Sequence, residues 1–195
     1  MKKDILIAGV GGQGILSLAY VLDNSALEAG FYFKQTEVHG MAQRGGGVVS
    51  HVRISDQKIH SDMIPTGKAD IILGIEPLES LRYVDYLVPG GLILTNSQPF
   101  INISQYPEIE TLEKAIKSYR SILFDATKLA KEAGTIYAEN MVLLGALSNF
   151  LPMDKGLMKK WVKELFASKG EKIVEINIKA FDSGCQAVSL DLLCI

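Results

Sequence analysis

Two glycine-rich segments carry the residue types and spacings in this sequence that could do chemistry. The first consists of Gly9, Gly11, Gly12, Gln13 and Gly14, has the pattern G-x-G-x-x-G and directly follows a short apolar run. Glycine permits a tight turn and lets a ligand approach the backbone, and free N–H groups at the start of a following helix attract anions. This segment therefore predicts a site for a negatively charged ligand, with a plain strand-to-helix turn as the alternative.

The second segment, residues 36–47, combines an acid, a histidine, an arginine and three consecutive glycines. Its candidate functional residues are Glu37, His39, Arg44, Gly45 and Gly46. Arg44 offers a planar two-pronged donor to a phosphate or carboxylate, and His39 could carry a proton. The glycine N–H groups could bind an anion or lie against another chain. A flexible hairpin turn is the alternative interpretation.

Glu37 also fits a role known from dinucleotide-binding enzymes. In those enzymes an acid at the end of the second strand holds the ribose hydroxyls. Glu37 lies 23 residues beyond Gly14, close to where that acid belongs. A structural ion pair between Glu37 and Arg44 is an equally acceptable interpretation.

Apolar periodicity predicts the elements that position these segments. Strands are expected over residues 4–8, 31–36, 48–54, 69–75, 92–95 and 122–124. Helices are expected over residues 14–29, 77–87, 108–118, 127–133, 141–150 and 155–168. Asn140 is expected to cap one of these helices, Gly90–Gly91 to form a turn, and Gly145–Ala146 to let two helices approach closely. Residues 171–181 fit either a helix or a strand.

Alternating strands and helices predict an α/β fold. We expect a single three-layer, Rossmann-like domain over residues 1–195, with a mostly parallel sheet covered by helices on both faces. The part from about residue 152 is expected to be helical. Both glycine segments then open at the carboxyl edge of the sheet, which is where ligands bind in open α/β sheets.

Composition narrows the class of protein further. The 195 residues are 48% hydrophobic and 22% charged, as expected of a globular chain with one ample core. A net charge of −2 gives no field that would recruit nucleic acid or anionic lipid. No apolar stretch reaches the roughly 18 residues of a membrane span. The spacing of Cys185 and Cys194 suits neither a metal site nor a redox site, so we expect a soluble cytoplasmic protein that binds no metal itself.

Together the two segments resemble a known protein family. Gly-Gly-Gln-Gly at residues 11–14 and His-Gly-Met-Ala-Gln-Arg-Gly-Gly at residues 39–46 are similar to the gamma-type subunits of 2-oxoacid:ferredoxin oxidoreductases. The similarity continues through residues 52–54, 68–70 and 140–146, and it is loosest from about residue 152. Within the family it is greatest to the beta subunit of indolepyruvate ferredoxin oxidoreductases.

The resemblance implies oxidative decarboxylation of a 2-oxo acid, here indolepyruvate or another aryl pyruvate, to an acyl-CoA with reduction of ferredoxin. It also implies thiamine diphosphate, magnesium and 4Fe–4S clusters. Two cysteines cannot provide the four thiolates of a cluster. We therefore expect a large partner subunit to hold these cofactors, and this chain, inactive alone, to complete the cleft for substrate and CoA. There Arg44 would bind a carboxylate or phosphate, and His39 would be a proton carrier.

Two other functions are consistent with the same residues. One is a stand-alone oxidoreductase that binds NAD through Gly9–Gly14 and Glu37. The other is a non-catalytic scaffold that only seals the partner. The sequence leaves open which 2-oxo acid is used, whether this chain touches CoA directly, and whether the isolated chain forms a homodimer.

Overall fold

A six-stranded sheet forms the centre of the protein. The computed structural model describes residues 1–40 and 45–189. In chain order the strands are β1 (Lys2–Val10), β2 (Tyr32–His39), β3 (Gly47–Ser55), β4 (Ala69–Gly74), β5 (Leu87–Asn96) and β6 (Ser121–Phe124). Across the sheet the order is β2-β3-β1-β4-β5-β6, so β2 and β6 are the two edges.

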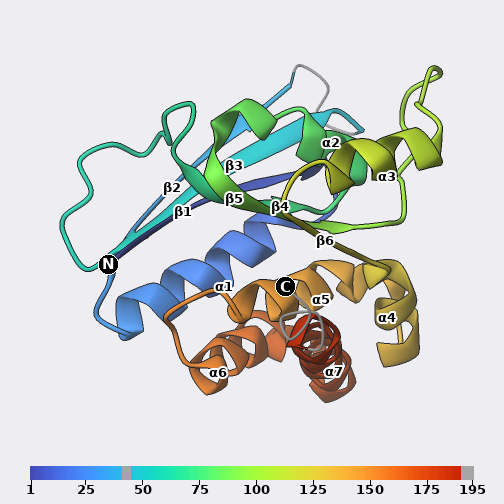
Figure 1. Ribbon diagram of the computed structural model, residues 1–195. Helices are drawn as coiled ribbons and strands as arrows, with labels where there is room; N and C mark the ends of the chain where they lie inside the picture. Colours follow the sequence, from blue (N-terminus) through green and yellow to red (C-terminus); the bar gives the residue numbers. More distant parts are fainter. Residues whose placement is uncertain (41–44, 190–195) are drawn as a thin grey trace.

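Helices cover both faces of this sheet. They are α1 (Ile15–Glu28), α2 (Pro77–Leu81), α3 (Ile109–Lys117), α4 (Ala126–Ala133), α5 (Glu139–Ser148), α6 (Lys155–Phe166) and α7 (Glu171–Ser189), with short 3-10 turns η1 (Val84–Tyr86), η2 (Ile136–Ala138) and η3 (Ala167–Lys169). Figure 1 shows α2 and α3 on one face and α1 with α4–α7 on the other. The predicted three-layer α/β fold is thus confirmed. Among the described residues, no helix combines the length and apolar character needed to cross a membrane.

The sheet is mostly parallel, with one exception. β1, β4, β5 and β6 run parallel to one another, whereas β3 is antiparallel to both β1 and β2. β2 and β3 therefore form a hairpin, and β3 is inserted between β1 and β2. In this register Gly47 lies opposite Val10, and Val48 lies opposite His39. The ends of β1 and β2 consequently share one edge of the sheet without being neighbours.

The central position of β1 in the sheet explains why its sequence is continuously apolar. Ile5 and Ile7 lie in the larger core under α1 and α5–α7, while Leu6 packs with Ile64 and Ile72 on the opposite face. Ile5, Leu6 and Ile7 are all fully buried. A strand covered on both faces has no solvent side, and therefore it shows no polar alternation.

Two predicted elements differ from the structure, and a third that was left open is a helix. The helix expected over residues 77–87 ends at Leu81, because Leu87 pairs with Ala69 and so belongs to β5. Gly90–Gly91 lies within β5 rather than in a turn between elements, and it accompanies a shift in register against β4. Residues 171–181, left undecided by the sequence, belong to the long helix α7.

A buried ion pair ties the amino end of β1 to β3. Asp4 is fully buried, and its carboxylate accepts hydrogen bonds from Arg53 Nε at 2.9 Å and Nη2 at 3.2 Å. Arg53 also donates to the carbonyls of Ser61 and Met63, while Asp70 accepts from the Asp4 N–H at 2.8 Å. The sequence similarity at residues 52–54 and 68–70 therefore falls on a structural clamp away from the glycine segments.

Helices α5 and α7 touch backbone to backbone. A Cβ added to Gly145 would lie 1.9 Å from the Phe181 carbonyl oxygen, and one added to Gly184 would lie 1.8 Å from the Val142 oxygen. The expected close approach at Gly145 is confirmed, and Gly184 supplies its counterpart on α7. Neither contact can relax through a side-chain rotation, because the opposing atoms belong to the backbone.

We predict that Gly145→Ala lowers the free energy of unfolding by about 3 kcal/mol, because α5 and α7 must separate to admit the methyl group. Gly156→Ala in α6 is the matched control. Its added methyl would meet only the Asp154 Oδ1 that caps α6, so the loss is limited to that cap, about 1 kcal/mol. Urea unfolding of both variants measures the difference, and equal effects would contradict the close-contact argument.

His51 on β3 holds the segment that follows β3. The residue is 2% exposed, its Nδ1 accepts a hydrogen bond from the Ile64 N–H at 3.2 Å, and its ring packs edge-on against Tyr86. Burial, with a smaller contribution from the nearby Arg53 charge, lowers the pKa of His51. Since the unfolded chain then binds the proton more tightly than the folded one, protonation favours unfolding.

The unfolded pKa of histidine is about 6.5. We predict that the contribution of neutral His51 to the free energy of unfolding is fully present above this pH and decreases as the pH falls below it. Chemical denaturation between pH 5 and 8 measures this dependence. His51→Asn keeps an acceptor near Nδ1 without the titration, so the variant should lose that part of the slope. An unchanged slope in the variant would assign the dependence to other groups.

Candidate functional site

The two glycine segments meet through a backbone hydrogen bond. The Gly11 N–H donates to the Gly46 carbonyl oxygen at 2.9 Å, and the Gly40 N–H donates to the Gly47 carbonyl oxygen at 3.2 Å. Next to this junction, the Glu79 carboxylate occupies the space that a Cβ on Gly47 would need. The predicted placement of both segments at one edge of the sheet is therefore observed, and it leaves the Gly11 N–H unavailable to a ligand.

Several other N–H groups of the first turn remain open. The Gln13 N–H donates to the Val10 carbonyl at 3.1 Å, but those of Gly12, Gly14, Ile15 and Leu16 have no acceptor among the described residues. Gly14 occupies the N-cap position of α1 in the left-handed conformation and has no side chain to cap the helix. The positive end of α1 is thus left for an external acceptor.

A cavity of about 610 Å³ opens at this helix end. It lies where the parallel strands β1, β4 and β5 and the loop after β6 reach the carboxyl edge of the sheet. The lining residues follow β1 and β4, lie at and after the end of β5, or belong to α1, α4, η2, α5, α6 and η3: Gly11, Gly12, Gln13, Gly14, Ser17, Ile75, Asn96, Gln98, Pro99, Phe100, Thr127, Ile136, Tyr137, Glu139, Asn140, Phe166 and Lys169. The site therefore combines segments that are distant in sequence.

One wall of the cavity is a hydrogen-bonded acid. The buried Asn96 at the end of β5 donates from Nδ2 to Glu139 Oε1 at 2.6 Å, and Thr127 Oγ1 donates to Glu139 Oε2 at 3.2 Å. Asn96 Oδ1 accepts from the Ala126 N–H at the start of α4. Burial raises the pKa of Glu139, although the bonds from Thr127 and Asn96 oppose this shift. The wall presents oxygen acceptors to the cavity.

Asn140 connects this wall to the glycine turn. It was expected to cap a helix, but α5 begins at Glu139 with Ala138 at the N-cap, so Asn140 lies inside the first turn. Its Nδ2 instead donates to the Gly14 carbonyl at 3.3 Å. The residue is 6% exposed, and its Oδ1 has no hydrogen-bond partner among the described residues. The cap prediction is wrong, because tertiary packing directs the amide toward α1.

The mouth of the cavity is apolar and exposed. Tyr137 is 87% exposed, and Phe100 and Ile136 are each about half exposed. The ammonium group of Lys169 lies 5.3 Å from the centre of the Phe166 ring and is the lining residue with a positive charge. An aromatic rim with one cation suits a large organic anion better than a small ion.

Those of the remaining predicted residues that the structure describes lie outside the cavity lining. Gly9 is inside β1, where a Cβ would meet the Gln13 side chain at 2.9 Å, and Gln13 Oε1 accepts from the Val10 N–H. Glu37 Oε1 lies 2.8 Å from His39 Nε2 near the end of β2. Arg44 lies outside the described residues.

The inserted strand β3 separates Glu37 from β1, so Glu37 does not have the position beside the G-x-G-x-x-G turn that the NAD alternative requires. Gly45 and Gly46 stay at the junction, where Asn102 Nδ2 donates to the Gly45 carbonyl at 2.7 Å. The ligand roles of Glu37, His39, Arg44, Gly45 and Gly46 stay predictions.

Sequence reasoning missed the acidic wall. Asn96 and Thr127 are polar residues at or just after strand ends, and this position is the signal that could have marked them. Glu139 gave no such signal, because it reads as an ordinary acid in the first turn of a helix.

Comparison with known proteins now identifies the family. The family described as pyruvate ferredoxin/flavodoxin oxidoreductase matches residues 4–187. The chain belongs to this family. It is 42% identical to the indolepyruvate oxidoreductase subunit IorB of Pyrococcus horikoshii over 198 aligned residues, with 96% of each chain covered. The resemblance predicted from the sequence is thereby confirmed.

Solved structures share the fold of this family member. The gamma subunit of a keto/oxoacid ferredoxin oxidoreductase from Geobacter sulfurreducens is 26% identical with a TM-score of 0.71, and the match covers 96% of this chain and 99% of that one. The 2-oxoglutarate:ferredoxin oxidoreductase from Magnetococcus marinus is 22% identical with a TM-score of 0.77, and the match covers 97% of this chain and 31% of that one.

We predict that Gly14→Ala is more damaging than Gly12→Ala. Both glycines have positive φ, +79° and +104°, but a Cβ at Gly14 would lie 2.3 Å from Asn140 Nδ2 whereas one at Gly12 would meet nothing. Each variant loses about 1–2 kcal/mol from the left-handed backbone, and Gly14→Ala loses about 1–3 kcal/mol more from the contact. Thermal unfolding compares the two.

The double variant Gly14→Ala/Asn140→Ala should recover part of that additional loss, since the contact is then absent. Additive losses in the double variant would show that the two residues do not interact.

Proposed function

We propose that this chain is the small subunit of a 2-oxoacid:ferredoxin oxidoreductase that acts on indolepyruvate or another aryl pyruvate. The complete enzyme decarboxylates the oxo acid oxidatively, forms an acyl-CoA and reduces ferredoxin. Family membership over residues 4–187 and the identity to IorB support this assignment. The chain's own part is to form one wall of the cleft for the oxo acid and CoA.

The observation that carries the proposal is the polarity of the cavity. At the glycine turn the open N–H groups of Gly12 and Gly14 begin α1, and on the wall formed with Asn96 and Thr127 the Glu139 carboxylate offers acceptors. CoA has phosphates that need donors and hydroxyl and amide groups that need acceptors. We infer that the phosphates lie at the glycine turn, where the end of the α1 dipole also favours them.

Thiamine diphosphate, magnesium and the 4Fe–4S clusters belong to a larger partner in this proposal. Among the described residues no group of three His, Cys, Asp or Glu side chains could hold a metal ion. The sequence has two cysteines. One of them, Cys185, shares a hydrogen bond of 3.2 Å with Ser148 Oγ between α5 and α7. These residues do not fit a four-thiolate cluster.

The exposed rim gives the partner a place to bind. Phe100, Ile136 and Tyr137 surround the mouth of the cavity and present apolar surface to solvent. A large subunit that covers this rim removes the apolar groups from water and closes the cavity, so the chain is inactive without it. Arg44 as anion ligand and His39 as proton carrier remain part of the proposal.

We predict that Glu139→Gln raises KM for CoA about tenfold or more in the co-expressed complex, because a hydrogen bond to a charged group contributes about 1.5–3 kcal/mol. Steady-state assays with indolepyruvate, CoA and ferredoxin measure this change. Glu113→Gln is the matched control, because Glu113 is on α3, pairs with Lys117 and does not line the cavity.

Assembly of each variant is checked by co-purification with the large subunit. An unchanged KM in a fully assembled Glu139→Gln complex would contradict the proposed CoA wall. If rim variants such as Tyr137→Ala change only assembly, and turnover per complex stays constant for all cavity variants, the chain acts as a scaffold.

A further inference from the structure

A second surface, remote from the cavity, has the features of an interface. It is the open edge of β2, and no residue of β2 lines the cavity described above. The strand has eight residues with neither proline nor glycine, and within the described chain its outer hydrogen-bonding groups face no other strand. The other edge strand, β6, has only four residues. An edge as long as that of β2 is a template for pairing with another strand.

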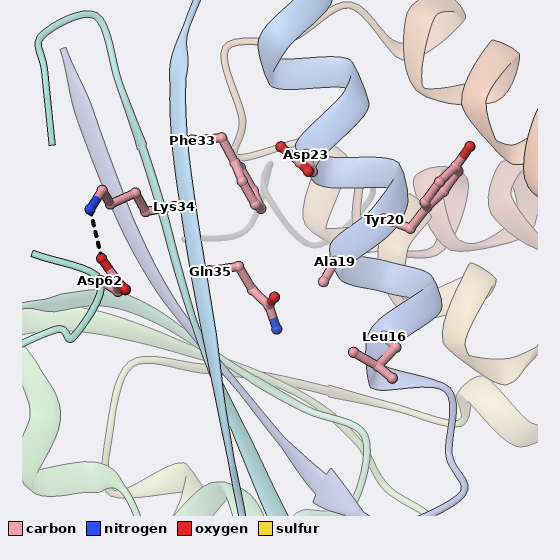
Figure 2. A pocket seen from close by; sticks show the side chains of 8 residues that line it. All are labelled: Leu16, Ala19, Tyr20, Asp23, Phe33, Lys34, Gln35 and Asp62. Carbon is pink, nitrogen blue, oxygen red and sulfur yellow. Dashed lines mark hydrogen bonds and ion pairs between the residues drawn. The ribbon is translucent and has the colours of Figure 1, made fainter.

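A groove of about 470 Å³ runs along this edge between β2 and α1. Figure 2 shows Phe33 and Gln35 pointing from β2 toward Ala19 and Leu16 on α1, while Lys34 points the other way to Asp62. Leu16 is 63% exposed. Leu16, Ala19 and Phe33 thus give the groove an apolar part, beside Asp23, Gln35 and the Lys34–Asp62 pair.

Two-fold symmetry restricts how a second copy could pair with this edge. Identical antiparallel neighbours in one sheet are related by an axis perpendicular to the sheet, which keeps each residue on its own face. Residues directly opposite each other share a face of the sheet. One residue of β2 must therefore lie on the axis, directly opposite the same residue of the second copy. The candidates near the middle of β2 are Lys34, Gln35 and Thr36.

The side chains select one of these registers. With Gln35 on the axis, Tyr32 lies opposite Val38 of the second copy and Lys34 lies opposite Thr36. Tyr32 and Val38 are the two exposed large hydrophobic residues of the strand, 52% and 47% exposed. This register pairs them twice and sets no like charges directly opposite each other.

The other two registers lack this complementarity. An axis through Lys34 would bring two ammonium groups face to face. An axis through Thr36 would set Val38 against Lys34 and leave Tyr32 without an apolar partner.

Gln35 suits a position on the axis. Its Nε2 donates to Ser50 Oγ at 2.9 Å within the same chain. The second N–H and the Oε1 of its amide can then form reciprocal hydrogen bonds with the same amide of the other copy.

We propose that two copies of this chain associate through antiparallel pairing of their β2 strands about a two-fold axis at Gln35. The six-stranded sheet then continues into a second one, and the groove beside α1 becomes part of the interface. None of the residues that line the cavity lies on β2. The inference therefore stands independently of the proposed CoA wall.

The test is a disulfide across the axis. Gln35→Cys brings two thiols together at a Cα separation of about 4.5–5.5 Å, within the range that a disulfide spans. Thr36→Cys is the matched control, because its side chain lies on the opposite face and faces Lys34 of the second copy. Both variants and the unmodified full chain, which controls for Cys185 and Cys194, are oxidised with copper phenanthroline and compared on non-reducing gels.

We expect most of the Gln35→Cys variant to migrate at twice the chain mass. The Thr36→Cys variant and the unmodified chain should migrate at the mass of one chain. A second measurement does not depend on oxidation. Light scattering should give twice the chain mass for the unmodified chain and a single mass for Val38→Arg, with Ile101→Arg at the cavity side as the unchanged control. Circular dichroism confirms that each variant is folded.

A monomeric unmodified chain, or efficient cross-linking of Thr36→Cys instead of Gln35→Cys, would overturn the proposal. The same cross-linking in the complex with the large subunit asks whether the edge is available there. Cross-linking in the isolated chain that disappears in the complex would assign β2 to the large subunit and would also overturn the proposal.

Discussion

The hydrogen bond between the Gly11 N–H and the Gly46 carbonyl sets the geometry on which the candidate site depends. It joins the turn after β1 to the start of β3 with backbone atoms alone. The next residues, Gly12 and Gly14, then take positive φ values, and α1 begins with its N–H groups directed at the cavity. Asn140 completes the arrangement from α5 by donating to the Gly14 carbonyl. A side chain at Gly14 would occupy the space of the Asn140 amide.

The helix ends around the cavity differ in how they are capped. Asp125 and Asp154 accept hydrogen bonds from the first turns of α4 and α6, so the donors there are partly satisfied within the chain. α1, whose start lines the cavity, has no side-chain cap, although α4, whose Thr127 also lines it, is capped by Asp125. Stability alone would favour capping α1 as well. The open N–H groups at the start of α1 are therefore the feature best explained by an external ligand.

The fold separates two surfaces that could otherwise interfere. Insertion of β3 moves β2 away from β1, so the glycine turn stays beside β4 and β5 while β2 becomes an edge. The cavity rim and the β2 edge then lie on different elements. The residues that line the cavity and the residues of β2 form separate sets.

The sequence by itself determined the elements, the layers and the family. Apolar runs and glycine stops located the strands, and two glycine segments with an unusual spacing identified the relatives, because these signals are local. It could not show that β3 enters the sheet antiparallel, since the pattern of a strand does not reveal its neighbours. It also misjudged Asn140 and overlooked Glu139. The role of each depends on which distant atom its side chain meets, and only the packing of α5 against α1 and β5 decides that.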